Sequence, residues 1–357
     1  MSDLAVTGLG CHSAVGLGVA QTCAAIRAGI MRLQSYPDYV PQAPDLAEGP
    51  PEPTAHAPAP GLPSGAGLER RLGALAARAL RDLLRDCTLG RQDFRRMHLL
   101  LALPEKGREG IEDLDAGKLL QGVRRSSSLE FEAGEGAFHD GHCAALLALD
   151  EARRIVTADG AARCLILAVD SNVLDGNLDW LDRSWRLKSQ RNVDGFVPGE
   201  AGVAILVEGA ATAARRRAPI LARIAGIGGG EEPSPSSSDA QSTGAGLTAA
   251  IRAACPEMSG RPVRWVVCDM NGESYRGREW GVVLTRLGPG FDSPAVWHPA
   301  TSVGDVGAAS GALQLAMVCR AFARGYAPAA EALVWCASDS SRRSAGCIRS
   351  AAGERTN

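Results

Sequence analysis

An α/β fold, with helices layered on sheet, is predicted by short apolar runs that follow amphipathic helical segments. CLILAVDS (164–171) and AGVAILVE (201–208) are continuous apolar runs with the length of buried central strands. CAALLALDEARRIV (143–156) carries apolar residues at helical spacing just before the first of these runs. A helix followed by a wholly apolar strand is typical of a layered α/β protein.

The remaining segments of the first half are assigned in chain order from residues 1 to 215. The pattern predicts a strand at 1–10, helices at 19–28 and 68–85, and a strand at 97–103. Residues 36–67 are rich in proline and glycine and are expected to form a loop or mobile flap. We assign no structure to residues 105–128, and expect a loop-rich cap at 171–196.

The second half, 216–357, repeats a similar order of helices and strands. It opens near Pro219 and continues through a Gly/Ser/Pro linker at 228–246. The later elements are a helix at 247–254, a strand at 265–270, a helix at 307–325 and a strand at 332–338. Two similar halves are what a duplicated core would give.

Composition and charge exclude several classes of function. Of 357 residues, 22% are charged and 45% hydrophobic, and the net charge is −2, so nothing in the overall charge favours nucleic acid or an anionic membrane. No apolar stretch is long enough to span a bilayer, and the N-terminus has no secretory signal pattern. The ten cysteines occur singly, which is typical of a reducing cytoplasm and predicts neither disulfides nor a metal site. No motif for a cofactor is found.

Four segments, in this order, carry a resemblance to a known family. They are VTGLGCHSAVGLGVAQTCAAIRAG (6–29), GFVPGEAGVAILVE (195–208), PILARIAGIG (219–228) and SVGDVGAASGALQLA (302–316). Together they resemble the β-ketoacyl synthases of the thiolase superfamily. The resemblance implies a five-layered αβαβα thiolase fold with two similar halves.

The same resemblance implies a catalytic site whose elements are altered in this chain. In the family a Cys at a helix N-terminus attacks an acyl thioester, two His assist decarboxylation, and backbone N–H groups hold the oxyanion. Here His142 falls at the Cys position, Asn271 replaces the first His and Asp305 replaces the second. The glycine-rich turn near the C-terminus reads SDSSRRS (338–344). We therefore expect no acyl condensation.

Two features leave alternatives open at this point. Cys143 lies one residue late, about 100° around a helix, so it is either a buried core thiol or a nucleophile restored by a shift in the preceding loop. The polar stretch DMNGESYRGREW (269–280) is either a solvated loop, with Arg276, Arg278 and Glu279 paired locally, or a contact surface for a partner.

Three functions fit these observations. The first is a non-catalytic adaptor or chaperone that binds a partner protein, since the 269–280 stretch looks similar to degenerate thiolase-like proteins beside type VI secretion toxins. The second is a subunit resembling the chain-length factors, which pair with an active ketosynthase. The third is an acyltransferase that uses Cys143. An acyl carrier protein is a candidate partner, and a homodimer or heterodimer through the strand at 164–170 is expected.

Overall fold

The structure, a computed structural model, describes residues 4–36, 39–41, 54–63, 65–112, 114–238 and 240–351. Much of the predicted flap at 36–67 lies outside these ranges. Its described part is not all loop, because β2 (Gln34–Tyr36) and β3 (Thr54–His56) form a small antiparallel sheet. The hydroxyl of Thr54 donates to the carbonyl of Lys188 (3.0 Å), which ties β3 to the predicted cap.

In the described part of the chain, ten strands form one mixed sheet that divides into two equivalent halves. The first half has the order β5-β4-β6-β7-β1, and the second has β10-β9-β11-β12-β8. In each half the first three strands of this order are parallel to one another, and each of the last two pairs antiparallel with the strand before it. The first-half strands are β1 (Leu4–Ser13), β4 (Met97–Ala102), β5 (Gly134–Phe138), β6 (Arg163–Ser171) and β7 (Glu200–Gly209). The second-half strands are β8 (Ala222–Glu231), β9 (Val263–Cys268), β10 (Phe291–Trp297), β11 (Glu331–Ala337) and β12 (Arg342–Arg349). The predicted duplication is therefore present as topology.

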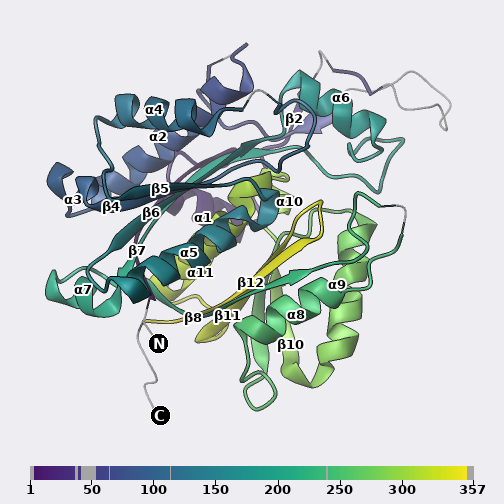
Figure 1. Cartoon of the computed structure of the whole chain (residues 1–357). Coiled ribbons are helices and arrows are strands. Elements are labelled where there is room, and N and C mark those ends of the chain that lie inside the picture. Colours follow the sequence, from purple (N-terminus) through teal and green to yellow (C-terminus); the bar gives the residue numbers. More distant parts are fainter. Residues whose placement is uncertain are drawn as a thin grey trace.

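Helices cover both outer faces and fill the space between the two halves of the sheet (Figure 1). The middle layer is formed by α5 (Ala144–Ala158) and α11 (Ser310–Arg324). The outer layers are α2 (Leu68–Asp86) with α4 (Ala116–Ser127), and α8 (Ala245–Ala254) with α9 (Ser274–Leu287). Shorter helices are α1 (Val19–Arg27), α3 (Arg91–Arg95), α6 (Asp175–Arg183), α7 (Ala210–Arg215) and α10 (Ala300–Val303). This is the five-layered αβαβα arrangement, and no described helix is long and apolar enough to cross a bilayer.

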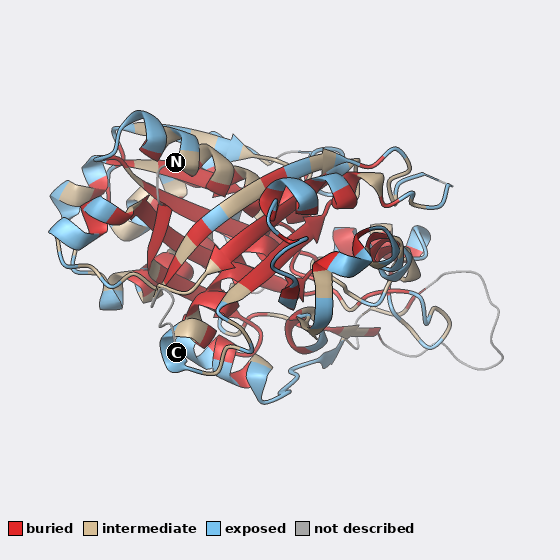
Figure 2. Cartoon of the chain, turned by 90° about the horizontal axis from the view of Figure 1, so that it is seen from below, coloured by how far each residue is buried: buried red, intermediate tan, exposed pale blue. Residues whose placement is uncertain are grey.

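The continuous apolar runs arise because the central strands are buried on both faces (Figure 2). Along β6, Cys164 and Ile166 pack into the core shared with α5 and α11, whereas Leu165 and Leu167 pack against α2. A strand between two helical layers has no solvent-facing side, so alternation of apolar and polar residues is lost. The predicted strands at 164–171, 201–208 and 332–338 all match within one residue.

Glycines extend β8 into residues that the sequence predicted as linker. A Cβ at Gly226, Gly228 or Gly230 would fall well inside contact distance of a backbone carbonyl oxygen of helix α8. Glycine therefore lets α8 lie directly on the strand, which is its use where two backbones approach closely. The linker prediction is wrong for residues 228–231 for this reason.

Two further predictions are corrected by the fold. Of the two interpretations of 269–280, the solvated loop is wrong: the stretch follows β9, its residues from Ser274 onward begin α9, and Arg276 and Glu279 are buried. Strand β6 cannot continue the sheet across a dimer axis, because it pairs with β4 on one side and β7 on the other. The free edges of the sheet are β5 and β10.

Candidate functional site

The candidate site forms where both central helices begin. Short 3₁₀ turns, Gly141–Cys143 and Gly307–Ala309, lead into α5 and α11. They bring His142 and Asp305 together, although 163 positions separate them in the chain. His142 Nε2 donates to Asp305 Oδ1 (2.8 Å) and lies 3.0 Å from Oδ2. Both side chains are buried.

Asn271, after β9, joins the same pair. Its Nδ2 donates to Asp305 Oδ2 (2.7 Å) and to Glu273 Oε2 (2.9 Å). Asp305 also accepts the backbone N–H of Gly307 (2.8 Å). Three of the four residues singled out from the sequence, His142, Asn271 and Asp305, therefore meet in one hydrogen-bonded group.

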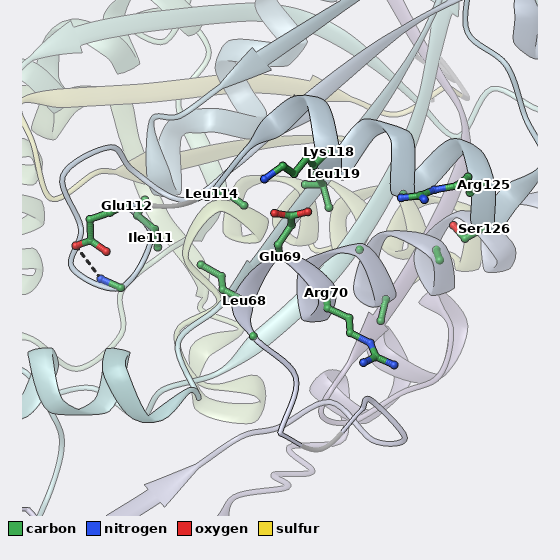
Figure 3. Close-up of a pocket in the computed structure, with 16 residues that line it drawn as sticks. Leu68, Glu69, Arg70, Ile111, Glu112, Leu114, Lys118, Leu119, Arg125 and Ser126 are labelled. Carbon is green, nitrogen blue, oxygen red and sulfur yellow. Dashed lines mark hydrogen bonds between the residues drawn. The ribbon is translucent and has the colours of Figure 1, made fainter.

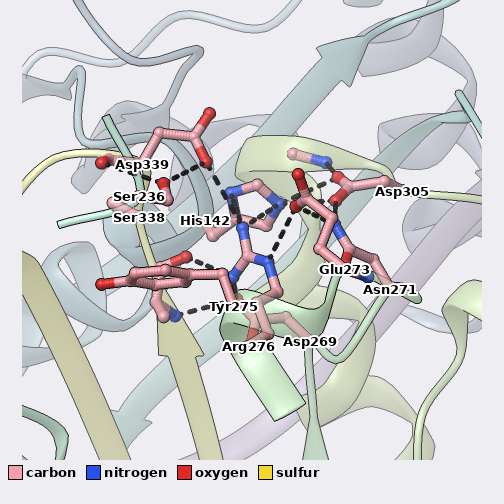
Figure 4. Close-up of polar contacts among 12 residues, drawn as sticks. His142, Ser236, Asp269, Asn271, Glu273, Tyr275, Arg276, Asp305, Ser338 and Asp339 are labelled. Carbon is pink, nitrogen blue, oxygen red and sulfur yellow. Dashed lines mark hydrogen bonds and ion pairs between the residues drawn. The ribbon is translucent and has the colours of Figure 1, made fainter. Parts of the chain in front are cut away.

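Arg276, from the first turn of α9, lies at the centre of the group (Figure 4). Its Nη1 donates to Asp269 Oδ2 (2.9 Å) and to the carbonyl of Ala337 (2.5 Å). Its Nη2 lies 3.4–3.5 Å from the two ring nitrogens of His142. Its side chain is only 3% exposed. Sequence reasoning left Arg276 in either a solvated loop or a partner contact surface, and thereby missed the central cation of the site.

A second arginine, Arg186 of the cap, closes the group from the other side. It forms two hydrogen bonds with Glu273 (2.7 and 3.0 Å) and two with Asp339 (2.6 and 2.9 Å). The cap is partly helical (α6), and Arg186 also stacks over the rings of Trp180 and Phe196. The cap is thus fixed onto the second half by paired, largely desolvated charges.

We call these residues the charge cluster. It combines His142 and two arginines with an asparagine and four carboxylates: Arg186, Arg276, Asn271, Asp269, Glu273, Asp305 and Asp339. Buried charges are tolerated only when paired and hydrogen-bonded. The cluster meets this condition by drawing its members from distant elements.

The cluster shifts the pKa of its own members. Burial would raise the pKa of Asp305, but the charge and hydrogen bond of His142, with Arg276 and Asn271, hold that pKa well below its usual range. Burial would lower the pKa of His142, but Asp305 outweighs it and raises that pKa above the ordinary value. The ionised carboxylate and the protonated imidazole stabilise each other.

Cys143, the fourth predicted residue, points away from the charge cluster. Its thiol donates to the carbonyls of Cys336 (3.2 Å) and Arg342 (3.3 Å), and it is fully buried. Burial raises the pKa of the Cys143 thiol to about 11. The thiolate is therefore scarce at neutral pH, and thiolate is the nucleophilic form of cysteine.

Backbone N–H groups around the site are also occupied. The N–H of Cys143 donates to Ser338 Oγ (3.1 Å). The N–H groups of Asp339 and Ser340, in the segment that replaces the glycine turn, both donate to the carboxylate of Glu105 (3.0 Å each). A negatively charged reaction intermediate would compete with a carboxylate already bound there.

Cavities also occur away from the charge cluster. One of them, of 720 Å³, lies on the outer face between α2 and α4 (Figure 3). Its lining includes Gly73, Ala74 and Ala77, and Figure 3 shows Glu69 and Lys118 close to each other in it. Within the described ranges, no group of His, Cys, Asp and Glu side chains is placed to hold a metal ion.

The sheet topology and the paired helix starts define a thiolase fold, which is also the fold of solved ketosynthases. Solved structures with this fold include the ketosynthase from module 6 of the bacillaene synthase from Bacillus subtilis 168, with TM-score 0.77 and 12% identity over 98% of this chain and 72% of that one. The ishigamide ketosynthase/chain length factor gives TM-score 0.77 and 15% identity over 98% and 99% of the chains. A type II polyketide ketosynthase in complex with its acyl-carrier protein gives TM-score 0.75 and 17% identity over 98% of this chain and 99% of that one. No family model matches the sequence. No curated protein matches it either.

Proposed function

We propose that this chain is a non-catalytic protein of the ketosynthase fold that acts by binding a partner protein. One observation carries the proposal: paired buried charges fill the position where the resemblance placed the reacting groups. Asn271 and Asp305, which stand at the two His positions, form hydrogen bonds with each other and with neighbouring groups inside the protein. A group held this way is suited to fixing structure rather than to transferring protons.

The alternative of an acyltransferase that uses Cys143 is less well supported. In the described structure the sulfur of Cys143 contacts the carbonyl oxygens of Cys336 and Arg342, and its hydroxyl neighbours are Ser338 and Ser344, so none of these hydrogen-bond partners is a basic side chain. An activated nucleophile needs an adjacent base or a lowered pKa. Burial has the opposite effect on Cys143.

A cavity beside the charge cluster offers a surface for the partner. It has a volume of 530 Å³ and is lined on one side by Asn271 and Glu273, and on the other by Met31 and Leu33. Met31 and Leu33 are 60% and 39% exposed, which is high for large apolar side chains. Adjacent exposed apolar residues mark interaction surfaces. We assign the partner to this surface, and a type VI secretion effector remains one candidate for it.

A second candidate function is a chain-length-factor-like subunit that pairs with a ketosynthase. The free edge of β5 favours it, because GEGAF (134–138) has neither a proline nor a bulge to block pairing. The other edge, β10, is protected by Pro294, a register shift and a positive φ at Ser293. We therefore place a homodimer or heterodimer at β5, and an acyl carrier protein is a partner that only this second function requires.

The first test asks whether the protein accepts an acyl group. We expect no mass increase after incubation with acetyl- and malonyl-thioesters, in the wild type or in Cys143→Ala. An adduct near one per chain that is absent from Cys143→Ala would overturn the non-catalytic assignment.

The second test locates the partner surface. Once a partner has been purified with the protein, Met31→Asp and Leu33→Asp should weaken the complex at least tenfold, because each places a charge in an apolar contact. Leu17→Asp is the matched control, since Leu17 is 53% exposed but does not line this cavity. Equal effects of all three would place the partner elsewhere.

A further inference from the structure

A small pocket between α1, β10 and α11 has an unusual lining. Its volume is 260 Å³, and it shares no residue with the charge cluster. Apolar walls come from Ile26, Val296 and Met317, with the thiol of Cys23 beside them. The volume is below the about 300–1,000 Å³ of pockets for drug-sized ligands, so an occupant must be smaller.

Aromatic rings form the other wall. Trp297 and Tyr326 are stacked, with centroids 6.3 Å apart and an interplanar angle of 25°. Trp265 packs edge-on against Trp297 at 4.8 Å and fixes that ring from behind. Because these two rings stack on each other, the wall offers ring edges, against which an aromatic ligand can pack edge to face.

Arg27 lies over this wall with its guanidinium 4.2 Å from the centroid of Tyr326. The cation–π contact occupies a face of the guanidinium and leaves its N–H edge available. In the described chain Arg27 forms no ion pair, and the pocket lining contains no Asp or Glu. An arginine edge of this kind is suited to binding a carboxylate through two hydrogen bonds.

The surroundings add positive charge. Burial raises the pKa of Tyr326, while Arg320, Arg27 and Arg324 act on it in the opposite direction. Neither Arg320 nor Arg324 is paired with a carboxylate among the described residues. The helix ends do not need these cations, because the backbone N–H groups of Ala28 and Ile30, and those of Gly325 and Tyr326, already bond to the last-turn carbonyls of α1 and α11.

We propose that this pocket binds a small aromatic carboxylate. The ring of the ligand packs edge-on against Trp297 and Tyr326, its carboxylate accepts from Arg27, and the apolar walls exclude water from the ring. The inference does not depend on the proposed partner function, since the pocket would bind the same ligand in an active or an inactive protein.

The experiment is isothermal titration calorimetry of the full-length protein with phenylacetate, and with phenylacetamide as the uncharged probe of the same shape. We expect phenylacetate to bind at least tenfold more tightly than phenylacetamide. Arg27→Gln should abolish this difference. Thr301→Phe should weaken both probes, because Thr301 is exposed at the rim of the pocket and a larger side chain there narrows the entrance.

Arg96→Gln serves as the matched control, since Arg96 is another exposed arginine without an ion pair and lies in a different cavity. Thermal unfolding of each variant shows whether it remains folded. The proposal is overturned if neither probe binds, if both bind equally to the wild type, or if Arg27→Gln and Arg96→Gln have the same effect in folded proteins.

Discussion

At the scale of single residues, Arg276 holds together carboxylates that would otherwise repel one another. It contacts Asp269 directly and lies within 3.6 Å of Glu273 and 3.5 Å of Asp339. A buried ion pair adds little net stability over apolar residues, but removal of one partner leaves an uncompensated buried charge. The main effect of the cluster is therefore to determine which segments of the chain pack together, and its net contribution to the free energy of folding is small.

Arg276→Met should lower the free energy of unfolding by about 3–5 kcal/mol, because Asp269 then loses its cation inside the protein. Urea unfolding followed by circular dichroism measures this loss. Arg278 is exposed and lies two positions further along the same helix. Arg278→Met should therefore change the free energy of unfolding by no more than about 0.5 kcal/mol. Similar losses in both variants would contradict the structural role of Arg276.

The His142–Asp305 pair should make stability depend on pH. Because the folded-state pKa of His142 is raised, its contribution is complete below the unfolded pKa of about 6.5 and is lost as the pH rises through the folded value. The stability difference between the wild type and His142→Asn should therefore shrink from about pH 6 toward pH 9. A difference that is constant over this range would show that His142 does not titrate in contact with Asp305.

At the scale of elements, the packing of α8 on β8 requires glycines in the strand, because the two backbones lie in direct contact. Gly228→Ala should cost about 1–3 kcal/mol, because the new methyl group would collide with the carbonyl oxygen of Ala250. Gly229 provides a matched control one residue away, since a Cβ there meets its nearest atom only at 3.8 Å. Denaturation midpoints of the two variants test this, and equal values would contradict the close packing of α8 on β8.

The free edge of β5 should carry the dimer contact. The carbonyl of Phe138 accepts from Leu103, beside β4, so the N–H of the preceding Ala137 points to the open side. Ala137→Pro removes that donor without breaking a bond to β4, and should convert a dimer into a monomer with little change in melting temperature. Light scattering gives the mass. A wild-type mass of 37.2 kDa would refute the dimer itself.

At the scale of the whole molecule, the two halves share one core. The largest hydrophobic cluster combines α5 and β6 of the first half with α11, β9 and β11 of the second. Each half alone would expose one face of its sheet and one face of its central helix. Topological duplication therefore does not imply independent domains.

We accordingly predict that residues 1–215 and 216–357, produced separately, do not fold. Each fragment should lack a cooperative thermal transition and should bind a hydrophobic dye, whereas the whole chain unfolds in a single step. A cooperative transition in either fragment would show that the halves are separate folding units.

The sequence by itself determined the layered fold and three positions of the charge cluster. Central strands were predictable because burial on both faces leaves a continuous apolar run, as in β6 and β11. His142, Asn271 and Asp305 were predictable because they occupy element ends within recognisable motifs. Strands such as β5, with its glycines, and β12, with its arginines, gave no such pattern.

Only the tertiary structure decided the burial of the arginines and the direction of the Cys143 thiol. Arg276 and Arg186 lie in polar stretches that look solvated. Asp269 and Glu273 are close to Arg276 in the chain, but Asp339, and Glu273 as a partner of Arg186, come from distant elements. A charged residue is buried only where the fold supplies an opposite charge and hydrogen bonds. Local periodicity contains no information about such partners, because they meet only after both halves have packed on the shared middle layer.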